Sequence, residues 1–188
     1  LASARLAVAT PPTWLRLPVS LLSFLVLATL VLAGAFGSRD PLSNPLPLTI
    51  WTLLWVGLTL LQGLLGNLWY WIDPWYGPYR VASALLGRSR RDAPPFHMPE
   101  WVSLWPAVVL FLGFAWFELI YPAPDDPLRL AWAVGAYWLF TFAMTLLFGF
   151  EEWNGQGEFL SVFLSMVARF GVFGQEREEK VSLSLPGA

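Results

Sequence analysis

The sequence predicts an all-α fold, a polytopic transmembrane helical bundle with four spanning helices and one amphipathic interfacial helix. Of the 188 residues, 56% are hydrophobic and 13% are charged, whereas soluble domains carry about 25% charged residues. Four apolar runs are each about long enough to cross roughly 30 Å of hydrocarbon as a helix. We expect one membrane domain, residues 1–188, embedded in the lipid bilayer.

The run at residues 46–74, LPLTIWTLLWVGLTLLQGLLGNLWYWIDP, organises the chain, and we expect a continuous helix over 47–72. Polar and small residues gather on one side of that helix at about 100° per residue. They are Thr52, Thr59, Gln62, Gly63, Gly66, Asn67 and Asp73. Because polar groups facing lipid are costly, this stripe predicts a helix that packs against the rest of the bundle.

Three further spans are expected, at residues 17–37, 104–121 and 130–150. Small residues four positions apart, such as Ala131 and Gly135, favour close contact between helices. The segment 158–173 is two-sided, with Glu158, Ser161, Ser165 and Arg169 on one side and apolar residues on the other. This pattern indicates an interfacial helix, and a short fifth span is the alternative.

Lysine and arginine predict the orientation, because they are enriched in cytoplasmic loops. With four spans, one side holds Arg5, Arg16, Arg80, Arg88, Arg90, Arg91, Arg169, Arg177 and Lys180. The other side holds Arg39 and Arg129. We therefore expect both termini to be cytoplasmic.

Composition also excludes several functions. The net charge of −2 leaves no basic surface for nucleic acid. The absence of cysteine excludes disulfides, thiolate nucleophiles and iron–sulfur clusters. A single histidine excludes a bis-histidine haem within this chain and disfavours an all-protein zinc site. The sequence identifies no cofactor.

Several acids and the one histidine are expected at the cytoplasmic level. They are Asp73, His97, Glu151, Glu152 and Glu158. A carboxylate beside a histidine can activate water or bind a divalent cation, so these residues are candidates for one catalytic site, with His97 as the candidate metal ligand. The alternative is that they cap helices and pair with loop arginines.

Three polar residues are expected inside the membrane: Gln62, Asn67 and Glu118. An acid at membrane depth is costly unless paired or protonated, so Glu118 is a functional candidate, with Arg39 as its expected partner. A structural Glu–Arg pair is the alternative. Gln62 and Asn67 either line a ligand cavity or hydrogen-bond to neighbouring helices.

Phrases spread over residues 37–173 resemble a family of bacterial polytopic membrane proteins labelled fenitrothion hydrolase. The matching phrases include GSRDP at 37–41, NPLP at 44–47, GNLW at 66–69, DPW at 73–75 and GEF at 157–159. The resemblance implies hydrolysis of an organophosphorus triester at the membrane, and it implies that this chain is an interior portion of a longer protein. It carries no catalytic residues onto this sequence.

Two functions follow. The first is an accessory or interaction subunit of a larger complex in the bacterial inner membrane. It is favoured because the sequence has no complete catalytic motif and contains 12 tryptophans. Its partners would be other membrane-protein subunits. The second is a membrane-embedded hydrolase of hydrophobic organophosphorus esters.

Overall fold

The computed structural model describes residues 13–88, 94–170, 173–175 and 181–183, which are almost entirely helical. Three helices are long and apolar enough to cross a membrane: α1 (Arg16–Phe36), the helix Pro45–Leu65 and α7 (Pro127–Phe148). The helix α6 (Trp105–Leu119) is apolar but has 15 residues, or about 22 Å. The predicted helical, membrane-type architecture is confirmed in this coarser form.

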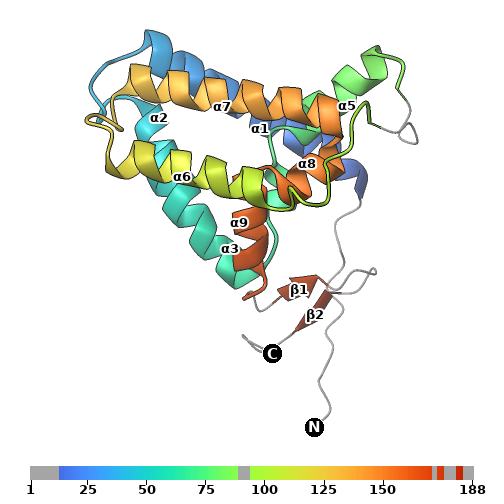
Figure 1. The fold of residues 1–188 in the computed structure, drawn as a ribbon. Helices are drawn as coiled ribbons and strands as arrows, with labels where there is room; N and C mark the ends of the chain where they lie inside the picture. Colours follow the sequence, from blue (N-terminus) through green and yellow to red (C-terminus); the bar gives the residue numbers. More distant parts are fainter. Residues whose placement is uncertain (1–12, 89–93, 171–172, 176–180, 184–188) are drawn as a thin grey trace.

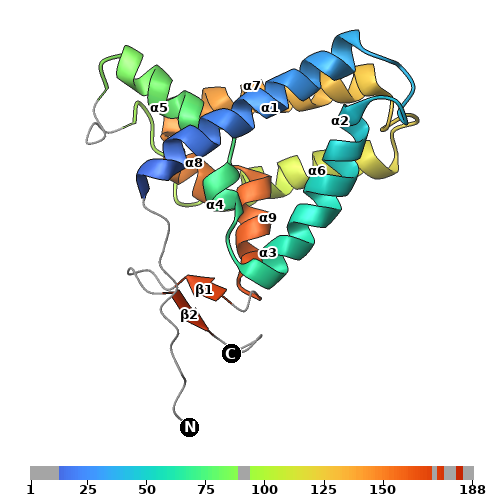
Figure 2. The ribbon, with the colours of Figure 1, turned by 180° about the vertical axis from the view of Figure 1, so that it is seen from behind.

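Helices α1 and α7 pack side by side in opposite directions, with α6 running along the same axis (Figures 1 and 2). Gly34 of α1 lies against the start of α7, where an added Cβ would come within 2.9 Å of the Pro127 carbonyl oxygen. Asp126 caps α7 by accepting a hydrogen bond from the Arg129 backbone N–H at 3.0 Å. A helix end with a capping acid and a proline in its first turn is well defined.

The second span is built from three consecutive helical segments. They are α2 (Pro45–Pro47), the π-helix η2 (Leu48–Leu58) and α3 (Thr59–Leu65). Asn44 caps its start by accepting a hydrogen bond from the Leu46 backbone N–H at 3.0 Å. The π-helix aims Trp51 and Trp55 at Phe114, with ring centroids 5.8 and 4.6 Å apart. Figure 2 shows α3 diverging from α1 as it descends.

The expectation of one continuous helix over residues 47–72 is wrong beyond Leu65. Gly66 adopts φ +90°, a conformation that L side chains rarely reach, and the helix ends there. The chain then turns back toward α1 and forms α4 (Trp69–Ile72). The break changes where the polar stripe lies: Gln62 and Asp73 are buried, whereas Thr52 on the intact part is exposed.

The remaining elements close one end of the bundle. Helix α5 (Tyr76–Leu85) packs on α1, and α8 (Phe150–Gln156) follows a kink at Gly149, which has φ +81°. Helix α9 (Phe159–Ala168) runs across the direction of α6 and packs on α3 and α6 (Figure 1). A 3-10 turn, η1 (Thr13–Leu15), precedes α1, and the strands β1 (Phe173–Gln175) and β2 (Val181–Leu183) pair antiparallel.

Helix α9 covers part of the predicted interfacial segment, but its polar side is not uniformly outward. Glu158 and Ser161 are buried, whereas Met166 and Phe170 are exposed. The polar side turns inward because Glu158 caps the helix and Ser161 bonds to a neighbouring tryptophan. Whether α9 lies at a membrane interface stays a prediction.

Two hydrophobic clusters hold the bundle at opposite ends. The first joins α2, η2 and α7 through Leu46, Ile50, Leu130 and Ala131. The second gathers η2, α4, α6, α8 and α9, and its buried members are Leu58, Trp69, Trp75, Ala107, Phe150, Phe159, Leu160 and Leu164. The second cluster surrounds the buried polar groups described next.

Candidate functional site

Gln62 joins the two sides of the helix break. Its side-chain oxygen accepts hydrogen bonds from the backbone N–H groups of Leu68 and Trp69, at 3.0 and 3.1 Å. Its amide nitrogen donates to Asn67 Oδ1 at 3.0 Å and to the Leu164 carbonyl at 3.2 Å. A fully buried Gln62 therefore satisfies backbone groups that the break leaves without helical partners. Both residues thus hydrogen-bond to neighbouring segments, and Asn67 also lines a pocket.

Asp73 lies directly after α4 and is 1% exposed. Its Oδ1 accepts a hydrogen bond from the Trp75 N–H at 2.8 Å. Its Oδ2 accepts no hydrogen bond of good geometry from the described residues, although the Tyr76 N–H contributes weakly to its electrostatics. Burial raises the pKa of Asp73 to about 7, the Trp75 bond opposes this shift, and the nearby Glu158 charge adds to it.

Glu158 is 0% exposed and caps α9. Its carboxylate accepts three hydrogen bonds, from the Tyr137 hydroxyl, the Leu160 N–H at 2.9 Å and the Ser161 N–H at 2.5 Å. Burial raises the pKa of Glu158, and these hydrogen bonds offset only part of the rise. Glu158 is thus a buried carboxylate with both oxygens hydrogen-bonded.

Arg16 is the cation nearest to this centre and is 6% exposed. Its guanidinium lies 3.7 Å from the ring centroid of Tyr70 and 3.9 Å from that of Tyr76, and its Nε donates to the Tyr70 carbonyl at 2.9 Å. Cation–π contacts of this kind strengthen when water is excluded. Arg16 also lowers the pKa of Asp73 through its charge.

Each of the two buried acidic residues accepts a hydrogen bond from a side chain of a long helix. The Ser20 hydroxyl, in the second turn of α1, donates to the Asp73 carbonyl at 2.5 Å, and Tyr137 in the middle of α7 donates to Glu158. Both contacts fall within the long helices and not past their ends. The return of the chain after Gly66 brings Asp73 there.

His97 and Glu152 meet at a separate place. His97 Nδ1 is 3.2 Å from Glu152 Oε2, and Glu152 Oε1 accepts a hydrogen bond from the Met98 N–H at 2.5 Å. His97 is exposed, and so is Glu151. Within residues 13–88 and 94–170 no group of three potential metal-ligating side chains occurs. The five predicted acid and histidine residues thus divide into a buried pair, a surface pair and the exposed Glu151.

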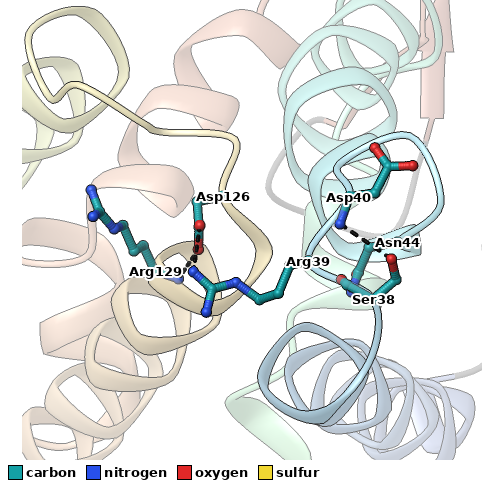
Figure 3. A network of polar contacts seen from close by, with 6 residues as sticks. All are labelled: Ser38, Arg39, Asp40, Asn44, Asp126 and Arg129. Atoms are coloured by element: carbon teal, nitrogen blue, oxygen red, sulfur yellow. Dashed lines mark hydrogen bonds and ion pairs between the residues drawn. The ribbon is translucent and has the colours of Figure 1, made fainter.

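The expected pairing of Arg39 with Glu118 is wrong, because Arg39 pairs with Asp126. Arg39 Nη2 lies 2.7 Å from Asp126 Oδ2, joining the loop after α1 to the start of α7 (Figure 3). In the same network, Asn44 Nδ2 donates to the Ala33 and Ser38 carbonyls at 2.9 and 2.8 Å. Arg39 pairs with Asp126 and not with Glu118 because Asp126 caps α7 directly opposite Arg39. Glu118, on α6, is half-buried.

A small pocket of about 160 Å³ lies between the segment after the break at Gly66, the end of α8 and the start of α9. Ser161 connects its walls, since its hydroxyl accepts from Trp69 Nε1 at 2.8 Å and donates to Asn154 Oδ1 at 2.7 Å. Ser165 also lines the pocket, and its hydroxyl donates to the Val162 carbonyl. Arg169, one turn further along, is exposed.

Sequence reasoning missed three members of the buried centre: Arg16, Ser20 and Tyr137. Arg16 and Ser20 are four residues apart at the start of an apolar helix, so they share a face, and that spacing was a usable signal. Tyr137 had no comparable signal, because a tyrosine in an apolar helix is ordinary.

Comparison with family models, with curated proteins and with solved structures finds no match to this chain.

Proposed function

We propose that this chain is an accessory subunit of a larger complex in the bacterial inner membrane, with other membrane proteins as its partners. One observation carries the proposal: the buried polar side chains serve the bundle's own backbone. Gln62 and Glu158 together bind five backbone groups of the chain, and Arg16 binds the Tyr70 carbonyl. Side chains used in this way stabilise an unusual fold of broken helices.

We further propose that α6 is a fourth span and that α9 lies in the interface. Exposed tryptophans support this, since Trp105 begins α6, Trp101 lies shortly before it, and Trp116 lies near its other end. Tryptophan favours both membrane–water interfaces. The first residues of α6 and of α1 lie toward the same side of the bundle (Figure 1), which supports two interfaces crossed by α1, α6 and α7.

The same arrangement supports cytoplasmic termini. Arg39 and Arg129 lie at the end with the loops 37–44 and 120–126, whereas Arg16 and Arg88 lie at the opposite end, where Arg88 donates to the Leu146 carbonyl. Arg5, Arg90, Arg91, Arg177 and Lys180 of the predicted charge count lie outside the described residues.

The native mass of the chain tests the subunit proposal. The chain would be extracted from its own membranes in mild detergent, and every co-purifying polypeptide identified. An assembly that contains different membrane proteins in fixed ratio is the expected result. A chain that migrates alone, or only with copies of itself, contradicts the proposal.

The second candidate is a membrane-embedded hydrolase of organophosphorus esters, favoured by the contact between His97 and Glu152. A carboxylate that orients a histidine is a common general-base arrangement. The test is hydrolysis of a thiophosphate triester by the purified chain, with and without chelator. Glu152→Gln should abolish hydrolysis and Glu151→Gln should not, since Glu151 is an exposed neighbour. Equal rates in both variants would exclude this site.

A further inference from the structure

The buried centre holds two acids and one base. Asp73 and Glu158 are 1% and 0% exposed, and Arg16 is 6% exposed. Neither of the two ion pairs found among the described residues involves Arg16, which is stacked on tyrosine rings instead. An uncompensated charge in such surroundings is costly, and a carboxyl group can avoid the cost by taking up a proton. The positive charge of Arg16 can balance one ionised carboxylate, so a second ionised carboxylate would be left without a balancing charge.

The hydrogen bonds distinguish the two acids. Glu158 receives three donors, distributed over both oxygens. Asp73 receives one good hydrogen bond, on Oδ1, and its Oδ2 is buried without one. Donors stabilise the charged form of a carboxylate. Glu158 is therefore the group built to carry charge, and Asp73 Oδ2 is the oxygen on which a proton costs no existing hydrogen bond.

We propose that Asp73 is a proton-binding site that titrates beside Glu158, the buried carboxylate with more hydrogen-bond donors. The proposal is independent of the proposed subunit function. The charged and titratable groups that face Asp73 are Arg16 from α1, Tyr137 from α7 and Glu158 at the start of α9, and the backbone N–H of Tyr76 also acts on it. Arg16 favours the ionised form of Asp73, whereas burial and Glu158 favour the protonated form.

A pocket lies beside the buried pair on the side of Glu158. Ser161, whose N–H binds Glu158, also lines this pocket of about 160 Å³. The pocket has polar groups in its lining and is large enough for several water molecules.

A matched pair of substitutions tests the assignment. Asp73→Asn imitates a protonated aspartic acid, so the variant should fold and its melting temperature at pH 8 should equal or exceed that of the unsubstituted chain. Glu158→Gln places an amide nitrogen against existing N–H and O–H donors, so it should melt at lower temperature at every pH. Equal damage from the two substitutions, or a failure of Asp73→Asn to fold, would overturn the proposal.

Infrared spectroscopy of the full chain in detergent gives a second, direct readout. Between pH 6 and 9 we expect the carbonyl band of a protonated carboxylic acid that disappears as the pH rises, with a midpoint near neutrality. The band should be missing in Asp73→Asn. Its absence from the unsubstituted chain, or its survival in Asp73→Asn, would show that Asp73 does not hold the proton.

Discussion

At the scale of single residues, the buried polar side chains act as substitutes for missing helical hydrogen bonds. Gln62 is the clearest case, because four hydrogen bonds converge on one amide with no exposed surface. Buried backbone groups left unpaired cost about 1–3 kcal/mol each. One polar side chain in an apolar helix thus allows the chain to turn inside the bundle, because it replaces hydrogen bonds that the turn removes.

Gln62→Leu should therefore be strongly destabilising although it is close in volume. It leaves the Trp69 N–H without its acceptor, whereas the Leu68 N–H keeps the Gly66 carbonyl at 2.8 Å. We therefore expect a loss of about 1–3 kcal/mol. Thermal unfolding in detergent measures the loss. Thr52→Val, at an exposed position of the same span, is the control and should change stability little.

The raised pKa of Asp73 predicts a pH dependence of stability. Its folded pKa is about 7, whereas the unfolded value is about 3.9. The folded state therefore binds the proton more tightly than the unfolded state. Asp73 therefore contributes at most about 4 kcal/mol to the free energy of unfolding. This contribution is fully present below about pH 4 and is lost as the pH rises through about 7. Denaturation followed from pH 5 to 8 should show this decline, and Asp73→Asn should remove it. A stability that rises across this range would contradict the assignment.

At the scale of elements, glycines fix where helices stop and how closely they approach. Gly66, at φ +90°, ends the second span and sends the chain back to α1. The sequence placed Gly66 on a polar stripe but could not show that the helix ends there, since glycine inside a long apolar run is also compatible with close helix packing. The length and apolarity of α1 and α7 were predictable, because their patterns are uninterrupted.

Gly66→Ala should destabilise the chain by about 1–3 kcal/mol, since alanine is strained at that φ. The matched control is Gly113→Ala in α6, where an added Cβ would meet nothing within 4 Å. That control should be neutral or stabilising by about 0.5–1 kcal/mol, because alanine favours helix. The melting temperatures of the two variants measure the difference. Equal shifts would contradict the view that the helix must end at Gly66.

A second glycine pair tests the contact between α1 and α7. A Cβ at Gly34 would lie 2.9 Å from the Pro127 carbonyl oxygen, whereas one at Gly135 would lie 3.7 Å from Val31. Gly34→Ala should lower the melting temperature by several degrees, and Gly135→Ala should not. If both are tolerated, α1 and α7 are less closely packed than described.

At the scale of the whole molecule, the fold class was predictable from the sequence and the candidate site only in part. Hydropathy identified three helices long and apolar enough to cross a membrane, and the pairing of His97 with Glu152 fell within the predicted group of residues. The burial of Asp73, the contacts of Arg16 and the pairing of Arg39 with Asp126 depend on contacts between residues at least 53 positions apart. Periodicity along one helix carries no information about such contacts.

The central claim is that this chain crosses a bilayer with the loops 37–44 and 120–126 on one side and α5 on the other. Because the chain has no cysteine, single cysteines introduced at Leu42 and Leu85, which are 97% and 83% exposed, can be labelled in sealed cells with a membrane-impermeant thiol reagent. We expect labelling of Leu42→Cys from outside and labelling of Leu85→Cys only after the membrane is opened. Labelling of both from outside, or of neither, would contradict the transmembrane arrangement.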